Sequence, residues 1–307
     1  MTPEAARRHA LLTLGGRRIG GVMVGAVDRI VFSTECVTIG AFRCAPGHPS
    51  FRDSGPIRDD CFVFPRTAVL IQHEDAPAFV ADPTIVTLYN RRQRYERRVV
   101  SADGDRCDWF AVSPDLLRSA LLDRDPVAAD HEQPIQFTHA RADASTYLAQ
   151  RQLFIEASRR SDVDQLDVEE RVVALLDRVL RLAYADRSPR SSGRRLMPAS
   201  ELADAVKRWV APRVSQRLTL GTIARAVDCS PFHLCRSFRR ATGLTLHGYR
   251  DEVRLRRALE RLEQGERDLS RLALDLGYSS HSHFTAAFRR TFGIPPSATR
   301  KLLIVRH

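Results

Sequence analysis

Two segments near the C-terminal end repeat a pattern of residues that could bind nucleic acid. The tripeptide Phe-Arg-Arg at 238–240 recurs at 288–290, and a glycine follows at the same distance in both copies, at Gly243 and Gly293. An arginine guanidinium can donate two parallel hydrogen bonds to a phosphate, or to the O6 and N7 atoms of guanine. The repeated arginines therefore indicate phosphate contacts, and Arg236, which precedes the first pair, is the best candidate for reading a base.

The residues around these arginines predict the elements that position them. Each copy has a short apolar helix, a tight turn, a serine that can cap the next helix, and a longer helix that ends at the glycine. This order is typical of a helix–turn–helix, whose second helix enters the major groove of DNA. The expected core residues are Ile223, Ala224, Val227, Leu234 and Phe238 in the first copy, and Leu272, Ala273, Leu276, Phe284, Phe288 and Phe292 in the second.

A further helix, over 246–262, is predicted between the two copies, with Val253, Leu255, Leu259 and Leu262 as its buried positions. A rigid connecting helix would fix the distance between the two reading helices. Both could then enter successive major grooves on one face of DNA, about 34 Å apart. A shorter helix over 201–210, capped by Ser200, is expected before the first copy.

The net positive charge of the chain comes entirely from its C-terminal part. The 307 residues carry a formal net charge of +11, of which residues 1–185 contribute −2 and residues 186–307 contribute +13. A local excess of this size suits a polyanion, because neutralised phosphates release their condensed counterions. Taken alone, it fits a solvated basic surface equally well.

Residues 218–301 resemble the DNA-binding domain of the AraC/XylS type (AraC family) of transcriptional regulators. The second copy carries most of that family's signature, namely Gly277-Tyr278-Ser279-Ser280, His283-Phe284, Ala287-Phe288-Arg289-Arg290 and Phe292-Gly293-Ile294-Pro295-Pro296. The resemblance implies promoter DNA as a partner, RNA polymerase as a further one, and a homodimer. Some family members have an arginine where this chain has Ala286, which implies weaker readout by the second helix.

The DNA-binding residues follow from exposure on the two longer helices and from family position, which also turns Phe232 and Cys235 toward the groove. The full set is Ser230, Phe232, His233, Cys235, Arg236, Arg239, Arg240, Ser280, His281, Ser282, His283, Thr285, Arg289 and Arg290. Arg236 is expected to read a base, and the four arginines of the repeated pairs to grip phosphates without reading sequence.

The N-terminal part predicts a different architecture. Short strands rich in Val, Ile and Phe, separated by Gly, Pro and Asp turns, favour a β-sandwich or barrel, with strands at 22–27, 36–43, 61–64, 68–73, 84–89 and 107–112. This domain looks like the cupin-like effector domain of the same family, which implies a small-molecule effector in the barrel. Arg43, Phe51, Arg66, Tyr89, Tyr95 and Trp109 are candidates to line a pocket, or equally to pack or lie on the surface.

Two helices are predicted after the strands, at 143–160 and 168–184, and the second has an apolar stripe that fits its own core or a dimer contact equally well. A polar, basic segment with Pro and Gly then marks a linker. The expected fold is therefore α+β with two domains: a cupin-like effector and dimerisation barrel at 1–185, a linker at 186–197, and an all-α double helix–turn–helix domain at 198–307.

The cysteine and histidine patterns bear on an alternative, an enzyme. Six cysteines occur without a Cys-x-x-Cys pair, and the N-terminal half has no His-x-His motif, so no metal or other cofactor is expected. Four cysteines fall on or beside predicted strands, where burial is the usual fate and a sensing thiol or zinc ligand the alternative. A cupin-like enzyme, or a thiol-dependent DNA-repair protein fused to the DNA module, remains the second hypothesis; a nucleoid-type protein without sequence preference is the third.

No apolar run is long enough to span a membrane, and the first residues lack the apolar core of a secretion signal. A reducing, cytoplasmic location is therefore expected.

Overall fold

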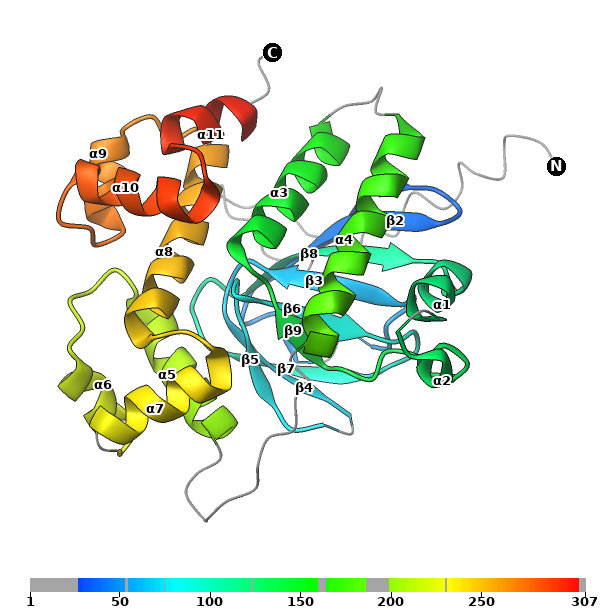
Figure 1. Ribbon diagram of the computed structural model, residues 1–307, viewed down its shortest axis with the longest axis horizontal. Coiled ribbons are helices and arrows are strands. Elements are labelled where there is room, and N and C mark those ends of the chain that lie inside the picture. The colour runs from blue at the N-terminus through cyan, green and yellow to red at the C-terminus, as the bar shows by residue number, and fades with distance from the viewer. Residues whose placement is uncertain are drawn as a thin grey trace.

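The N-terminal part of the chain is built from antiparallel strands, and the C-terminal part is helical (Figure 1). The structure, a computed structural model, describes residues 27–52, 55–74, 76–122, 124–159, 164–185, 199–229 and 231–303. The two-domain α+β class predicted from the sequence is confirmed. The linker predicted at 186–197 and most of the strand predicted at 22–27 lie outside the described residues.

The strands form two sheets. The larger has the order β1-β2-β8-β3-β6-β9, with β1 at Val27–Ser33, β2 at Val37–Cys44, β8 at Asp105–Val112, β3 at Cys61–Pro65, β6 at Ile85–Tyr89 and β9 at His139–Arg141. The smaller has the order β5-β4-β7, with β5 at Phe79–Ala81, β4 at Val69–His73 and β7 at Tyr95–Val99. Every pairing is antiparallel.

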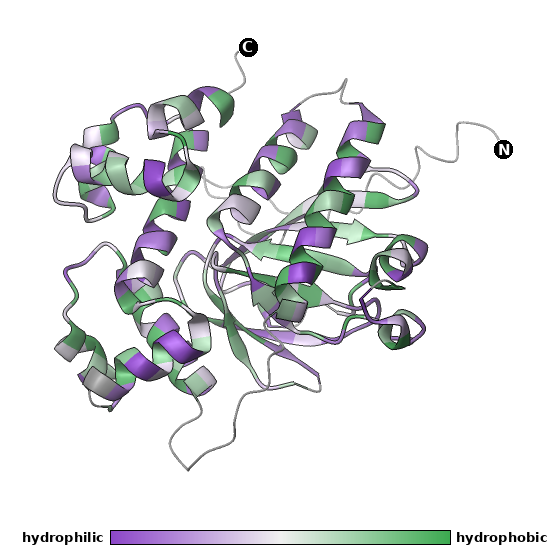
Figure 2. Ribbon diagram, viewed as in Figure 1, coloured by the Kyte–Doolittle hydropathy of each residue, from purple (hydrophilic) through white to green (hydrophobic). Residues whose placement is uncertain are grey.

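Helices cover the face of the large sheet that is turned away from the small sheet. Alternate strand residues such as Ile39, Phe62 and Phe110 join one apolar core with α1 (Pro114–Leu122), α3 (Ala144–Arg159) and α4 (Gln165–Ala185). The strands are mostly hydrophobic, whereas the helices alternate hydrophobic and hydrophilic residues (Figure 2). The apolar stripe of α4, including Val172 and Val179, packs into this core of its own domain.

The space between the two sheets is filled by side chains of both. Phe51, Phe79 and Ile71 form one cluster there, and Tyr89 and Trp109 belong to a second. Arg97 of β7, 1% exposed, donates to Asp105 of β8 at 2.6 Å. This buried ion pair explains why β7, with the sequence Tyr-Glu-Arg-Arg-Val, carried no apolar pattern and was missed. Strands β5 and β9 are three residues each, too short for a pattern.

The C-terminal helices agree with the predicted double motif. They are α5 (Ala199–Val210), α6 (Leu220–Ala226), α7 (Pro231–Thr242), α8 (Leu246–Glu263), α9 (Leu269–Asp275), α10 (His281–Phe292) and α11 (Pro296–Leu303), and a short 3-10 turn at Ala211–Arg213 follows α5. The remaining short elements belong to the N-terminal domain: α2 at Pro126–Ala129 and a 3-10 turn at Pro49–Phe51. All expected core positions of both copies are buried. Ser200 lies inside the first turn of α5 rather than at its cap.

Helix α8 connects the two motifs and is held by the N-terminal domain through buried charges. Arg66, which follows β3, reaches Glu260 and Glu263 at the end of α8, with N···O distances of 3.5 Å and 3.4 Å. Arg151 of α3, 2% exposed, bridges Glu263 and Asp108. Burial alone would raise the pKa of Glu263, but the guanidinium groups of Arg151 and Arg66 hold it below its ordinary value. We call these residues, with Glu260, the α8 charge cluster.

A second set of contacts holds the start of α8 and the first motif. Tyr249 of α8 donates its hydroxyl proton to Asp82 at 2.8 Å, in a fully buried position. Lys207 of α5 lies 3.8 Å from the same carboxylate, and Asp204 of α5 accepts from the backbone N–H of Val80 in β5 at 3.2 Å. The middle of α8 is fixed by Arg256, which donates to the Ala142 carbonyl at 2.8 Å.

The two motifs differ in how they join the N-terminal domain. Phe284, Phe288 and Phe292 of the second motif belong to the same apolar core as the sheet and α3. The first motif has a core of its own, which includes Leu234 and Phe238, and it meets the N-terminal domain mainly through the polar contacts of α5 and Tyr249. Within the described residues, no helix is long and apolar enough to span a membrane.

We expect Gly277→Ala to destabilise the second motif. Gly277 has a φ of +80°, and an added Cβ would collide with the Ser215 carbonyl oxygen and with Arg254. The free energy of unfolding should fall by about 2–4 kcal/mol, measured by urea denaturation. The control is Gly221→Ala in α6, where no atom lies within 4 Å of the added Cβ; it should change little or stabilise by up to about 1 kcal/mol. Equal effects of the two variants would contradict this account of the turn.

We expect Glu263→Gln to weaken the contact between α8 and the N-terminal domain. At neutral pH the free energy of unfolding should fall by about 2–4 kcal/mol, because two buried guanidinium groups lose a charged partner. The folded pKa of Glu263 lies below its ordinary value of 4.5. Its contribution is therefore complete above that pH and is lost as the pH falls through the folded pKa, so the gap between variant and wild type should close on acidification.

The control for this measurement is Glu96→Gln. Glu96 is half-exposed and pairs with the exposed Arg52 at 3.3 Å, so its replacement should cost less than about 1 kcal/mol. A cost for Glu263→Gln as small as this, or one that does not change with pH, would show that the charge cluster does not stabilise the interface.

Candidate nucleic-acid interface

Helices α7 and α10 each bury one side and expose the other. Leu234 and Phe238 of α7 and Phe284 and Phe288 of α10 are fully buried. The opposite side of each helix carries the residues predicted to bind DNA, and these are exposed: Cys235, Arg236, Arg239 and Arg240 on α7, and His281, Ser282, His283, Arg289 and Arg290 on α10. His233 and Thr285 are half-buried, and Ser280 is exposed immediately before α10. The structure thus gathers these residues on the outer faces of two helices.

Two predicted residues cannot be placed in this way. Ser230 lies outside the described residues, and although Phe232 is part of α7, its side chain is not described. The equivalent of Ser230 in the second motif shows the expected local chemistry. Ser280 caps α10, because its hydroxyl oxygen accepts a hydrogen bond from the backbone N–H of His283 at 3.1 Å. At the other end, Gly293 closes the helix with a φ of +79°.

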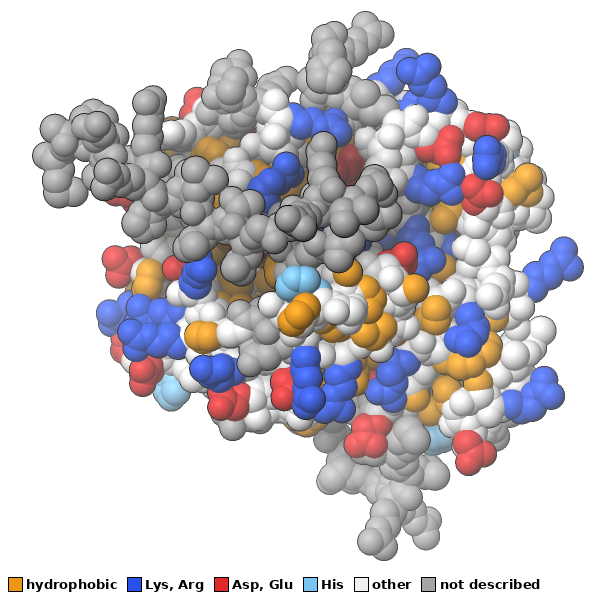
Figure 3. Space-filling view, turned by 180° about the vertical axis from the view of Figure 1, so that it is seen from behind, with side chains coloured by type: hydrophobic (Ala, Val, Ile, Leu, Met, Phe, Trp, Pro, Cys, Tyr) orange, Lys and Arg blue, Asp and Glu red, His pale blue; other side chains and the backbone are white. Residues whose placement is uncertain are grey.

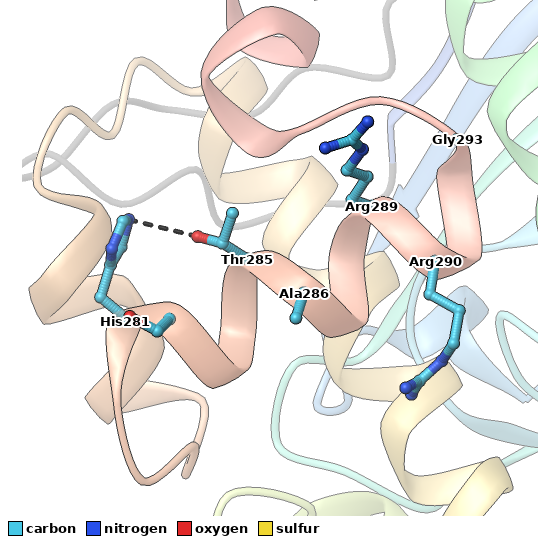
Figure 4. Close-up of a pocket in the computed structure, with 7 residues that line it drawn as sticks. His281, Thr285, Ala286, Arg289, Arg290 and Gly293 are labelled. Carbon is cyan, nitrogen blue, oxygen red and sulfur yellow. Dashed lines mark hydrogen bonds between the residues drawn. The ribbon is translucent and has the colours of Figure 1, made fainter.

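The exposed side of α10 forms a shallow hollow (Figure 4). The residues that line it are His281, Ser282, Thr285, Ala286, Arg289, Arg290 and Gly293. Thr285 and His281 are hydrogen-bonded to each other, with 3.3 Å between Oγ1 and Nε2. Arg289 and Arg290 project in different directions from the far end of the helix. The small Ala286 leaves the middle of the hollow open between these polar ends.

Arginines on both helices lack a partner among the described residues. Arg236, Arg239 and Arg289 make no hydrogen bond or ion pair with any other residue that the structure describes. Many other arginines of the chain are paired with carboxylates, as Arg261 is with Glu266 and Asp275. Basic and acidic side chains are interspersed over the visible back of the molecule (Figure 3). The unpaired guanidinium groups of α7 and α10 are therefore available to an external anion.

Helix α8 sets the separation of these two surfaces. It has 18 residues, which corresponds to a length of about 27 Å at 1.5 Å per residue. Figure 1 shows α7 and α10 at opposite ends of α8. Since successive major grooves lie about 34 Å apart along DNA, a connector of this length, with the width of the helices that it joins, is compatible with two helices that enter neighbouring grooves.

The pocket candidates of the N-terminal domain divide into two groups. Phe51, Tyr89, Tyr95 and Trp109 pack between the sheets. Arg43 and Arg66 instead line a cavity on the other face of the large sheet, beside α3 and the end of α8. The acidic partners of Arg66 and Arg151 were not predicted, because residues so far apart in the sequence share no local pattern.

Comparison with known proteins places the C-terminal domain. A family described as a helix-turn-helix domain matches residues 223–302. The regulatory protein SoxS of Salmonella typhimurium is 33% identical over 107 residues, which are 35% of this chain and 100% of SoxS. The bifunctional transcriptional activator/DNA repair enzyme AdaA of Bacillus subtilis is 28% identical over 106 residues, which are 34% of this chain. The chain spans only half the length of AdaA.

A solved structure is similar to part of the chain. The crystal structure of a transcriptional regulator of the AraC-type DNA-binding class from Chromobacterium violaceum is 28% identical, covers 33% of this chain and 89% of its own, and superposes with a TM-score of 0.32. SoxS is named a regulatory protein and AdaA a transcriptional activator as well as a repair enzyme. The helix-turn-helix family match at residues 223–302 covers the region from α6 to α11. The chain belongs to the AraC family of DNA-binding transcriptional regulators.

Proposed function

We propose that the chain regulates transcription by reading promoter DNA with α7 and α10, and that Arg236 is its main base-reading residue. The observation that carries the proposal is the position of Arg236 on the exposed side of α7, with no internal partner among the described residues. A guanidinium in that position can donate to the O6 and N7 atoms of guanine. The net charge of +13 in residues 186–307 supports the same reading.

Each exposed residue has a role in this proposal. Cys235 and Phe232 would contact bases beside Arg236, with Ser230 and His233 near the start of the first helix. The second helix would present the polar side chains of Ser280, His281, Ser282, His283 and Thr285 to the groove. Arg239, Arg240, Arg289 and Arg290 would bind phosphates. Because Ala286 has no group that can hydrogen-bond to a base edge, we expect the first helix to contribute more specificity than the second.

The rest of the chain has a regulatory role in the proposal. Residues 1–185 would form the effector and dimerisation domain, residues 186–197 the linker and residues 198–307 the DNA-binding domain. The partners would be promoter DNA, a small-molecule effector, a second copy of the chain and RNA polymerase, in the cytoplasm. Leu166 and Val173 support a dimer contact through α4, because these large apolar side chains are 63% and 40% exposed.

The buried cysteines weaken the alternative of a thiol-dependent repair enzyme. Cys44 and Cys61 are buried, and burial raises the pKa of both thiols. A nucleophilic thiol needs a lowered pKa. Among the described residues, no three His, Cys, Asp or Glu side chains come together as a metal site would require. The surroundings of Cys44 and Cys61 therefore favour a regulator over a thiol-dependent repair enzyme.

The test compares Arg236→Ala with Arg239→Ala on DNA selected from a random library by the wild-type protein. Arg236→Ala should relax the preference at one base position, by about 1–3 kcal/mol or roughly 5- to 150-fold in affinity for that base. Arg239→Ala should weaken binding to all sequences alike and lower the salt dependence by about one counterion. The exposed Arg118 of the N-terminal domain provides an Arg118→Ala control that should behave as the wild type.

If Arg236→Ala weakens binding to every sequence by the same factor, Arg236 contacts a phosphate and the proposed base readout is wrong. If the wild-type protein selects no sequence from the library at all, the chain binds DNA without preference, as a nucleoid-type protein does.

A further inference from the structure

A cavity of about 270 Å³ lies at the meeting point of the two domains. Its walls come from β1 and β2, the segment after β3, β8, the end of α3 and the last residue of α8. The lining residues are Arg29, Ala41, Arg43, Arg66, Asp108, Phe154, Ile155, Ser158, Arg159 and Glu263. It occupies the helix-covered side of the large sheet, and so it is separate from the space between the two sheets where an effector was expected.

The charges around this cavity are unbalanced. Four guanidinium groups and two carboxylates line it. Both carboxylates are already engaged, since Asp108 and Glu263 each pair with Arg66 and with Arg151. By contrast, Arg29 and Arg43 make no side-chain hydrogen bond or ion pair with any residue that the structure describes. The cavity is therefore lined by more guanidinium groups than carboxylates, and two of these guanidinium groups have no hydrogen-bond or ion-pair partner among the described residues.

Arg66 also has an unsatisfied hydrogen-bond donor, and this donor is buried. The residue is 7% exposed, and its Nε atom is buried without a hydrogen-bond partner among the described residues. A buried donor left without an acceptor costs about 1–3 kcal/mol, which an incoming oxygen atom would remove. The pKa of Arg43, which is exposed at the cavity, is lowered because partial desolvation and the nearby charges of Arg106 and Arg66 outweigh the opposing effect of Asp108 and Glu260.

Part of the cavity lining is apolar. Phe154 and Ile155 of α3 and Ala41 of β2 line it together with the arginines. An apolar wall with a few convergent charged groups is the usual composition of a small-molecule site, and the volume is near the lower end of the range for such sites. A ligand that suits this mixed lining is a small organic molecule with an oxyanion at one end.

We propose that this cavity binds a small organic oxyanion, a carboxylate or a phosphate ester, held by Arg43, Arg29 and Arg66. This proposal assigns a site and a ligand class to the effector proposed above. It rests on that proposed function only for the claim that the ligand regulates the protein. An oxyanion bound to Arg66 competes with Glu260 and Glu263 of α8, which the same guanidinium holds at 3.5 Å and 3.4 Å. Binding therefore acts on the helix that separates α7 from α10.

The experiment measures ligand binding without DNA, so its outcome does not depend on whether the proposed base readout is correct. The full chain is titrated with inorganic phosphate, phenyl phosphate, succinate and benzoate at constant ionic strength in chloride, and the thermal midpoint and Kd are recorded. At ten times Kd, a binding probe should raise the midpoint by about 3 °C. Phosphates and carboxylates distinguish the two kinds of head group.

The variant Arg43→Gln should weaken binding of the active probe at least ten-fold, and Arg29→Gln should weaken it to a smaller extent. Arg118→Gln is the matched control, because Arg118 is an exposed arginine of α1 paired with Asp130; it should bind as the wild type does. Should Arg43→Gln melt early without ligand, Arg29→Gln carries the test, since Arg29 is exposed and unpaired within the described residues.

Two results would overturn the proposal. One is the absence of any midpoint shift with all four probes. The other is a shift that Arg43→Gln and Arg29→Gln retain in full, which would place the anion elsewhere on this basic protein.

Discussion

The arrangement of the two DNA-reading motifs depends on the buried contacts that hold one helix, α8, against the N-terminal domain. Helix α8 connects the two DNA-reading motifs, and buried contacts to the N-terminal domain hold it along its length: Tyr249 to Asp82 near its start, Arg256 to Ala142 in its middle, and Glu260 and Glu263 to Arg66 and Arg151 at its end. A charge buried without its partner is far more costly than the pair is favourable. The charge cluster therefore favours one position of α8 over others, and the two reading helices take their positions from it.

The two motifs use this support differently. The second motif shares its apolar core with the sheet and α3, so it moves only if that core is disturbed. The first has a separate core and meets the N-terminal domain mainly through the polar contacts of α5 and Tyr249. The first also carries Arg236, whereas the second has Ala286 at the middle of its exposed side. The motif proposed to read more of the sequence is thus the one held by fewer apolar contacts, and a cavity beside α8 is well placed to alter their relation.

Local pattern was enough to predict the DNA-binding domain. The repeat, its capping serine at 280, its glycine turn at 277 and every core position depend on residues a few places apart, and the structure agrees with them. The misses have two causes. Strands β5 and β9 are too short to show a pattern. The pair of Arg97 with Asp105 across the sandwich and the α8 charge cluster, from Arg66 to Glu263, join residues of different elements. Pairings of this kind need the tertiary fold, so Arg43 and Arg66 could be singled out as pocket candidates, but neither the position of the pocket nor the partners of Arg66 could be derived.

The central claim is that α8 fixes the spacing of two reading helices, and DNA itself can measure that spacing. Fragments of genomic DNA that the purified protein retains at physiological salt would be sequenced, and the distance between recurring elements determined. The account predicts paired elements with centres about 10–11 base pairs apart, one helical turn, and weaker binding when synthetic sites are lengthened by half a turn. Sites with a single element, or paired elements whose spacing varies without loss of affinity, would contradict it.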